Sequence, residues 1–278
     1  MVTTMLAFSG KVALVTGAGA GIGRGIALGL AQRDANVIVT DINARAGEET
    51  VRKILKNGGH ALFVKMDVSN SEEVQDAIST SVSEFGRLDS LVNNAGLAGQ
   101  SYDSIFKVPE QVWDRTIDVN LKGVFLCSKY AIREMVRKRG RVEKGSIVNI
   151  SSVMGLSAVP QCTPYCASKG GVVALTKAMA LDCAPLRIRV NCICPGAVLT
   201  PSQERFYRRQ RNPKRTRGIY EKGYPIGRIG KPEDIGDLVC FLAGPESSYI
   251  TGSIFVADGG MHAQYGEAFL DKINMGGL

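Results

Sequence analysis

Short apolar runs alternate with amphipathic stretches along almost the whole chain. Most of the apolar runs are too uniformly apolar to leave one face in water, which is typical of strands covered on both faces. These runs predict strands at residues 11–16, 36–40, 61–66, 88–93, 145–151, 188–193 and 253–257. The stretches between them have helical spacing of apolar positions, at residues 21–33, 43–57, 71–85, 110–138, 163–184 and 232–243.

This alternation of strand and helix predicts an α/β fold. Parallel strands joined by right-handed helical crossovers form a sheet with helices on both faces. We therefore expect a Rossmann-type doubly wound parallel sheet of about seven strands. The chain contains no internal repeat, low-complexity segment or linker, so residues 1–278 are expected to form a single domain.

Composition favours a globular protein. The 278 residues are 45% hydrophobic and 22% charged, which suits one large core rather than a disordered or fibrous chain. No basic segment precedes an apolar run at the N-terminus, and no run approaches the roughly 20 apolar residues that a membrane span requires. We therefore expect a soluble, cytoplasmic protein with no membrane partner.

The seven cysteines predict neither a disulfide framework nor a metal site. Their number is odd and their density is low, so reduced thiols are expected. Cys192 and Cys194 lack a second ligand pair at zinc spacing, and Cys162 and Cys166 have no nearby histidine. We expect no bound metal.

The formal net charge of +8 comes from one segment. Of the 34 basic residues, seven lie within residues 205–217, which contain no acid, and the remaining 27 nearly balance the 26 acidic residues. In a nucleic-acid-binding protein, the excess of basic residues is usually spread over more of the chain than this one segment. We therefore expect no nucleic-acid partner.

Polar residues and turn formers follow six of the predicted strands. The carboxyl ends of parallel strands meet at one edge of a sheet, where open α/β sheets bind their ligands. We expect these residues to line a site: Thr16–Gly17, Asp41, Asp67, Asn93–Asn94, Ser151–Ser152 and Pro195–Gly196.

A glycine-rich turn, TGAGAGIG at residues 16–23, joins the first strand to the first helix. Gly17, Gly21 and Gly23 allow a sharp turn and a close approach of the backbone to a pyrophosphate, which the helix N-terminus attracts. This context predicts dinucleotide binding, with Ile22 among the contacting residues. A glycine-rich turn without a ligand is the alternative.

Two carboxylates follow the next strands. Asp41 lies 18 residues after Gly23, where it can accept hydrogen bonds from both ribose hydroxyls but would repel a 2′-phosphate. NAD is therefore favoured over NADP, although Arg45 could receive such a phosphate. Asp67 and Val68 are expected to border the adenine, although Asp67 would look the same as part of a helix N-cap.

The stretch PYCASKG, residues 164–170, places a tyrosine and a lysine four positions apart. On a helix, Tyr165 and Lys169 share one face, with only small residues between them. Alone, this spacing is common on protein surfaces, where a tyrosine ring stacks on a lysine side chain.

Five motifs together resemble the short-chain dehydrogenase/reductase family. They occur in the order and spacing of that family: the glycine turn, NNAG at 93–96, SSVMG at 151–155, YCASK at 165–169 and PG at 195–196. The resemblance extends from residue 10 to about residue 260. It implies an NAD(P)-dependent oxidoreductase.

The resemblance implies a catalytic tetrad of Asn120, Ser152, Tyr165 and Lys169. A phenol of pKa about 10 is a poor base at neutral pH, and the lysine ammonium with the positive nicotinamide would favour its ionised form. Ser152 would donate a hydrogen bond to the substrate oxygen, and Asn120 would hold a water molecule beside Lys169. Family members also contact the cofactor through the positions of Tyr165, Lys169, Asn94, Val198 and Thr200.

The segment at about 199–230 corresponds to the mobile substrate loop of the family. Its arginines are expected to form a solvated helix face or, alternatively, to bind a carboxylate or phosphate of the substrate. Two further groups are assigned by position alone. Aromatic cover for a lid would come from Phe206, Tyr207, Tyr220 and Tyr224. The rest of the pocket would be lined by residues 97–101, Met154, Leu156 and Pro160.

The resemblance also implies a homotetramer. Helices near 110–138 and 163–184 form the subunit contacts of family tetramers, and the first of them carries more apolar residues than one buried face needs. The C-terminal extension of about 261–278 passes the usual end of the family, and it is either disordered or packed on a neighbouring subunit.

The sequence favours an NAD-dependent oxidoreductase acting on a small or medium secondary alcohol or ketone. A 3-oxoacyl-thioester reductase would use the same residues, and the arginines would suit its phosphate-bearing substrate. A non-catalytic dinucleotide-sensing protein on the same fold is the third hypothesis, and it has no need of the Tyr165–Lys169 pair.

Overall fold

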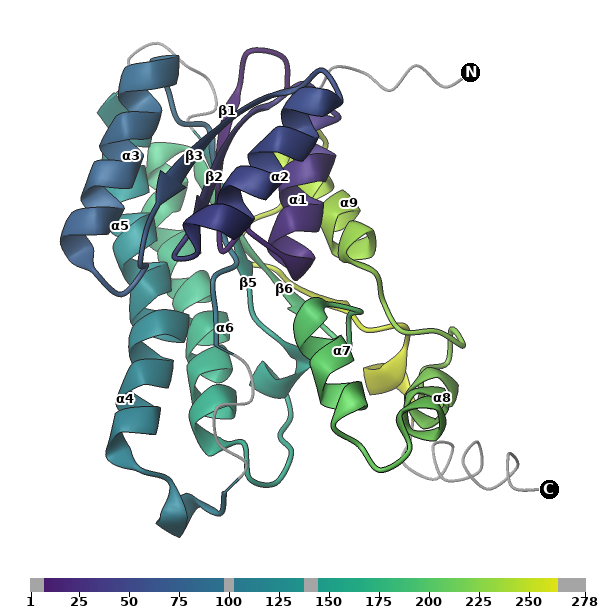
Figure 1. Ribbon diagram of the computed structural model, residues 1–278. Helices are drawn as coiled ribbons and strands as arrows, with labels where there is room; N and C mark the ends of the chain where they lie inside the picture. Colours follow the sequence, from purple (N-terminus) through teal and green to yellow (C-terminus); the bar gives the residue numbers. More distant parts are fainter. Residues whose placement is uncertain (1–7, 98–102, 138–144, 265–278) are drawn as a thin grey trace.

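The computed structural model describes residues 8–97, 103–137 and 145–264, which contain one parallel sheet (Figure 1). Its seven strands lie in the order β3-β2-β1-β4-β5-β6-β7, and every pair is parallel. The predicted Rossmann-type doubly wound sheet is confirmed. The strands are β1 (Val12–Thr16), β2 (Asn36–Asp41), β3 (His60–Lys65), β4 (Ser90–Asn93), β5 (Gly145–Ile150), β6 (Ile188–Pro195) and β7 (Ile254–Ala257).

Helices cover both faces of the sheet and enclose a core on each side (Figure 1). Apolar side chains of α1 (Gly21–Ala31), α2 (Ala44–Lys56) and α9 (Pro232–Ala243) pack on one face. Those of α3 (Ser71–Phe85), α5 (Gly123–Arg137) and α6 (Thr163–Cys183) pack on the other. Short helical turns complete the described elements, at η1 (Ile105–Lys107), η3 (Val153–Gly155), η4 (Ala184–Leu186), η5 (Pro245–Ser247) and η6 (Met261–Ala263).

The order of the strands reverses at β1, which pairs with β2 on one side and with β4 on the other. The connections after β1 and β4 therefore leave in opposite directions and open a crevice at the carboxyl ends of the strands. The glycine turn and the NNAG motif lie at this crevice.

Burial of the strands differs between the centre and the edges of the sheet. The residues of β1, β4, β5 and β6 are fully buried, as expected from their apolar runs. In contrast, β3 and β7 are only partly buried. Both are edge strands with one neighbour each, so the expectation of full cover does not hold for them.

The helix predicted at 110–138 is interrupted. α4 (Glu110–Ile117) is followed by a wider π-helical turn, η2 (Asp118–Lys122), before α5 begins. Asn120 lies in this turn and is fully buried. Such turns often occur at functional sites, because the extra residue turns a side chain in a new direction.

The expected substrate loop contains two helices, α7 (Pro201–Arg208) and α8 (Pro213–Gly223). Each begins with proline at its first position. The Thr200 hydroxyl caps α7 by accepting from the Gln203 amide at 3.2 Å, and the Asn212 side chain caps α8 by accepting from the Arg215 amide at 3.1 Å. Proline preceded by Thr or Asn is a helix start signal, so these helices could have been predicted.

Candidate active site

The glycine turn between β1 and α1 is folded as dinucleotide binding requires. Gly17 and Gly21 have φ values of +62° and +53°, which side chains rarely adopt. A Cβ on Gly17 would lie 2.8 Å from the Cα of Ala95, so the turn also packs too closely for a side chain. The Asn94 amide holds the turn by donating to the carbonyls of Thr16 at 2.9 Å and Gly17 at 3.1 Å.

A single hydroxyl ties the ends of β1 and β4 together. Thr16 Oγ1 accepts hydrogen bonds from the backbone amides of Asn94 at 3.0 Å and Ala95 at 2.9 Å. The threonine is almost fully buried. Its position before the glycine turn was noted in the sequence, but this role follows from a contact between distant segments.

A cleft of about 410 Å³ lies over these strand ends. Arg115 and Arg205, which the sequence did not single out individually, also line it. Three residues expected to contact the cofactor do not line it: Val198, Tyr165 and Lys169. The cleft brings together the other nine residues expected to do so: Gly17, Gly21, Ile22, Gly23, Asp41, Asp67, Val68, Asn94 and Thr200.

The two carboxylates of the cleft differ in how they are held. Asp41 accepts from the backbone amides of Gly19 at 2.9 Å and Asn43 at 2.8 Å. Asp67 accepts from the Ser69 amide at 2.9 Å and from Arg115 at 3.1 Å. Although partial burial of Asp67 opposes ionisation, these contacts keep the pKa of its carboxyl below the usual range.

Tyr165 and Lys169 lie on the first turns of α6, beside the end of β5. The Lys169 amine is buried, with 5% of the residue exposed, and it donates to the Ile150 carbonyl at 2.9 Å. It lies 5.8 Å from the centre of the Tyr165 ring. Ser152 follows β5, its hydroxyl accepts from the Met154 amide at 3.1 Å, and it lies near enough to the Tyr165 hydroxyl to lower the pKa of that phenol. The pair is therefore not a surface stacking arrangement.

Burial shifts the pKa values of this pair in opposite directions. It raises the pKa of Tyr165 to about 12, and the nearby Ser152 hydroxyl offsets this only in part. It lowers the pKa of Lys169 to about 8. The groups of the polypeptide therefore leave the phenol protonated at neutral pH, and Lys169 alone does not make it a base.

Asn120 reaches this cluster from the π-helical turn. Its side chain accepts from the Leu97 amide at 2.7 Å, donates to the Leu97 carbonyl at 3.0 Å and donates to Ser168 Oγ at 3.1 Å. Gly96 makes room for it, because a Cβ there would lie 3.3 Å from Asn120 Oδ1 and 3.5 Å from the Lys169 amine. The NNAG motif contains this glycine, but its role depends on the packing.

Replacing Asn120 with Ala is expected to lower the free energy of unfolding by about 1–3 kcal/mol, because it leaves the partly buried amide and carbonyl of Leu97 without their side-chain partner. Urea unfolding measures the change. The matched control is Asn57→Ala, which removes an exposed amide at the end of α2 and should change the value by less than about 0.5 kcal/mol. Equal effects of the two substitutions would contradict the assigned role.

The other residues predicted to line the substrate pocket are only partly described by the structure. Residues 98–101 lie outside the described residues, as do 265–278 of the C-terminal extension. Met154, Leu156 and Pro160 do not line the 410 Å³ cleft. Phe206, Tyr207 and Tyr220 pack on one another, with ring centres 5.6–5.8 Å apart, so they join α7 to α8.

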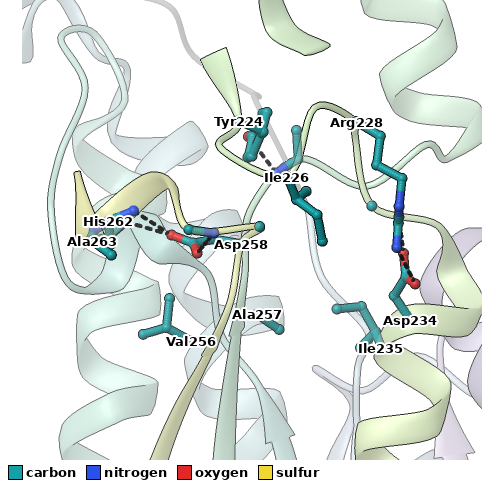
Figure 2. A pocket seen from close by; sticks show the side chains of 14 residues that line it. Tyr224, Ile226, Arg228, Asp234, Ile235, Val256, Ala257, Asp258, His262 and Ala263 are labelled. Atoms are coloured by element: carbon teal, nitrogen blue, oxygen red, sulfur yellow. Dashed lines mark hydrogen bonds and ion pairs between the residues drawn. The ribbon is translucent and has the colours of Figure 1, made fainter. Parts of the chain in front are cut away.

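A larger cavity of about 620 Å³ lies at the carboxyl end of β7 (Figure 2). Figure 2 shows its charged side chains turned toward one another. Arg228 pairs with Asp234 at 2.6 Å, and His262 Nδ1 lies 3.2 Å from Asp258. Nine predicted cofactor-binding residues line the smaller cleft and none lines this cavity, so we place the candidate cofactor site in the smaller cleft. The four predicted catalytic residues, Asn120, Ser152, Tyr165 and Lys169, line neither.

Comparison with known proteins agrees with this geometry. The family model described as enoyl-(acyl carrier protein) reductase matches residues 17–262. The chain is 39% identical over 252 residues to the cyclohexanol dehydrogenase of Acinetobacter sp. (strain SE19), covering 91% of this chain and 95% of that protein. It is 38% identical over 252 residues to a 3-oxoacyl-(acyl-carrier-protein) reductase of Thermotoga maritima, covering 91% of this chain and 98% of that protein.

A solved structure extends the likeness to three dimensions. The short-chain type dehydrogenase/reductase from Mycobacterium marinum aligns with a TM-score of 0.85 at 35% identity, covering 95% of this chain and 100% of that one. The chain belongs to the short-chain dehydrogenase/reductase family. The resemblance found in the motifs is thus confirmed, and the protein is an oxidoreductase of a family that binds nicotinamide dinucleotides.

Three further observations concern membrane spans, metal sites and cysteines. Within the described ranges, no helix has the length and apolar character needed to cross a bilayer. In the same residues, no three His, Cys, Asp or Glu side chains are grouped as they would be to hold a metal ion. All seven cysteines are free thiols, and six of them are buried.

Proposed function

We propose that this protein is an NAD-dependent dehydrogenase/reductase that interconverts a small or medium secondary alcohol and its ketone. The observation that carries the proposal is the Ser152–Tyr165–Lys169 cluster, in which a buried amine lies 5.8 Å from the centre of the phenol ring and a serine hydroxyl is near the phenol oxygen. A protein that only binds a dinucleotide has no need of this arrangement.

The residues of the cleft fit a dinucleotide. The turn would bring its backbone close to a pyrophosphate, with Ile22 beside it. Side chains at Gly17, Gly21 and Gly23 would collide with the backbone, Asn94 or Thr200, so the turn keeps this shape only with glycine. Asp41 would accept from the adenosine ribose, which supports NAD. The adenine would lie near Asp67 and Val68, and the nicotinamide half near Asn94, Val198 and Thr200. When bound, the nicotinamide accepts or supplies the hydride.

The protein supplies proton transfer and orientation. Ser152 would direct its hydroxyl at the substrate oxygen and hold it near Tyr165. Tyr165 would donate a proton to the oxygen during ketone reduction and accept one during alcohol oxidation, when the positive ring beside it favours phenolate. Lys169 would contact the ribose, and Asn120 would position this part of α6 through Ser168.

A panel of secondary alcohols and polyols with NAD, and of ketones with NADH, tests the proposal by absorbance at the nicotinamide band. Turnover of at least one alcohol–ketone pair is expected. Purified, folded protein that binds NADH but turns over no member of the panel would exclude the proposed activity.

Replacing Asp41 with Ala is expected to raise the ratio of kcat/KM for NADP to that for NAD by about tenfold or more, because it removes like-charge repulsion of the 2′-phosphate. Arg45, which is exposed nearby, would then be free to pair with that phosphate. Asp76→Ala on the exposed side of α3 is the matched control. An unchanged ratio would show that Asp41 does not set the preference for NAD.

A second candidate activity is 3-oxoacyl-thioester reduction. A relative of that name is 38% identical, and the basic residues near the cleft would suit a phosphate-bearing substrate. Oxidation of NADPH by an acetoacetyl thioester at a higher kcat/KM than any alcohol–ketone pair would favour it.

The proposal includes a cytoplasmic homotetramer. Large apolar side chains are exposed on α4, α5 and α6, the helices expected at subunit contacts. They include Trp113, Phe125 and Leu181, the last of them 77% exposed. Burial of these side chains between subunits would remove an unfavourable apolar surface.

A further inference from the structure

Arg24, near the start of α1, joins the glycine turn to α2. Its side chain is mostly buried, with 21% exposed. The guanidinium donates to the Gly19 carbonyl, to Thr50 Oγ1 at 3.0 Å and to Glu49 Oε1 at 3.0 Å. These partners belong to two elements, the turn after β1 and the helix after β2, so one side chain links the two.

Gly19 is the residue of the turn that contacts Asp41. Its backbone amide donates to Asp41 Oδ2 at 2.9 Å. A Cβ on Gly19 would lie 2.7 Å from the same oxygen, so glycine is needed for the turn to come this near the carboxylate. The other oxygen, Oδ1, accepts from the Asn43 amide at 2.8 Å. The orientation of Asp41 therefore depends on where the Gly19 amide points.

The peptide group between Ala18 and Gly19 is held at both ends. Its N–H is the donor to Asp41, and its carbonyl accepts from Thr50 Oγ1 at 2.9 Å. The same Thr50 oxygen accepts from Arg24 Nε. Thr50 is fully buried, so water does not compete for these contacts. Because a peptide group is planar, fixing its carbonyl also fixes the direction of its N–H.

These contacts restrict a residue that is otherwise free to change conformation. Glycine has more backbone freedom than any other residue, and the close approach to Asp41 requires glycine at position 19. Arg24 holds the Gly19 carbonyl directly and the Ala18 carbonyl through Thr50. The turn thus has the conformational freedom of glycine but is held in one conformation.

Helix stability does not explain an arginine at this position. A cation near the start of a helix opposes the helix dipole, and the first turn of α1 contains no acidic residue. Glu49 of α2 compensates the charge, and it also pairs with Lys53 at 3.0 Å. Because Nε, Nη1 and Nη2 of Arg24 all donate to groups of the protein, we expect Arg24 to act on a cofactor through the turn rather than by contact.

We propose that Arg24 is a positioning residue for cofactor selection, which acts through Thr50 and Gly19 to hold the Asp41 carboxylate toward the adenosine ribose. This inference rests on the proposed NAD dependence and assigns a residue that sets it. Without Arg24 the Gly19 amide would turn away, and Asp41 would adopt other rotamers. The ribose hydroxyls would then lose their acceptor, and a 2′-phosphate would meet less repulsion.

Replacing Arg24 with Met removes the donors and keeps an unbranched side chain. The dissociation constant for NADH is expected to rise about tenfold, and that for NADPH by less than about threefold. Both are measured without substrate, from the change in nicotinamide fluorescence on binding.

Arg33→Met is the matched control for this substitution. Arg33 lies just beyond the other end of α1 and makes contacts of the same kind, with the Gly29 carbonyl at 3.0 Å and Asp237 at 2.8 Å. Its replacement should change both dissociation constants by less than about twofold, because it touches neither the turn nor Asp41.

A double-substitution cycle tests whether Arg24 acts through Asp41. In the Asp41→Ala background, Arg24→Met should raise the dissociation constant for NADH by less than about threefold, because the group that Arg24 positions is absent. The same tenfold weakening in both backgrounds would overturn the inference. Urea unfolding of each variant verifies that folded proteins are compared.

Thr50 offers a second test that leaves the charge of Arg24 in place. Thr50→Val keeps the shape and removes the hydroxyl between Arg24 and the Ala18 carbonyl. NADH should bind about threefold or more weakly to this variant, and Thr50→Ser, which keeps the hydroxyl, should bind it within about twofold of wild type. Equal affinities of the Val and Ser variants would contradict the inference.

The outcomes separate the inference from the proposed function. Equal weakening of NADH and NADPH binding by Arg24→Met would show a general role in the shape of the turn, and would overturn the inference while leaving the alcohol–ketone activity standing. Selective loss of NADH binding, in a protein that turns over no alcohol–ketone pair, would support the inference and contradict the proposed function. A preference of the wild type for NADPH would contradict both.

Discussion

Replacing Tyr165 with Phe is expected to lower kcat by about 10³-fold while leaving the affinity for NADH nearly unchanged, because it removes the proton donor and acceptor but keeps the ring. The ring remains against α6 and Lys169, so no cavity forms. Initial rates with the best alcohol–ketone pair measure kcat, and quenching of protein fluorescence measures NADH binding. Tyr249→Phe, at a fully exposed ring, is the matched control.

The same variant separates catalysis from sensing. If the biological effect of the protein survives Tyr165→Phe while turnover is lost, the dinucleotide-sensing hypothesis is favoured. Turnover that falls by less than about tenfold would show that another group or water transfers the proton, and the assignment of Tyr165 would then be wrong.

Replacing Lys169 with Met is expected to lower kcat by about 10²-fold and also to change how stability depends on pH. The pKa of Lys169 is lowered from 10.5 to about 8 by burial in the folded protein. Between these values the unfolded chain binds more protons, so the free energy of unfolding rises with pH. Wild type should therefore gain up to about 3 kcal/mol relative to the variant between pH 8 and 10.5.

Urea unfolding at pH 7, 8, 9 and 10 measures this difference. Titrating groups remote from Lys169 are present in both proteins and cancel in the comparison, whereas the charge of Lys169 also acts on Cys192 and Cys194. Lys177→Met, at an exposed position on α6, should give a curve parallel to that of wild type. Parallel curves for Lys169→Met as well would contradict the burial-induced pKa shift.

Much of the fold could be predicted because strand and helix periodicity is local. The apolar runs gave the strands to within about two residues, since continuous apolar runs and the helical spacing of apolar positions are both set by neighbouring residues. The exposed faces of β3 and β7 could not be found in this way, because the position of a strand in the sheet depends on pairing between distant segments. Proline preceded by a capping residue also marks the starts of α7 and α8, so these helices were predictable as well.

In the candidate site, too, local spacing could be predicted from the sequence, whereas contacts between distant segments could not. The spacing of Tyr165 and Lys169 correctly predicted that they share a helix face. It did not predict that the Lys169 amine bonds Ile150 at the end of β5, or that burial would raise the pKa of Tyr165. Asn120 is the clearest case, since a π-helical turn aims its side chain at Leu97, and no local pattern encodes that turn.

The bond between Thr16 and the NNAG segment has a mechanical consequence. Thr16 Oγ1 accepts hydrogen bonds from both backbone amides that follow β4, and Thr16 also begins the glycine turn. The connections on either side of the strand-order reversal are thus coupled at a single point. A dinucleotide that ordered the glycine turn would therefore also restrain the NNAG segment through Thr16, before any substrate arrives.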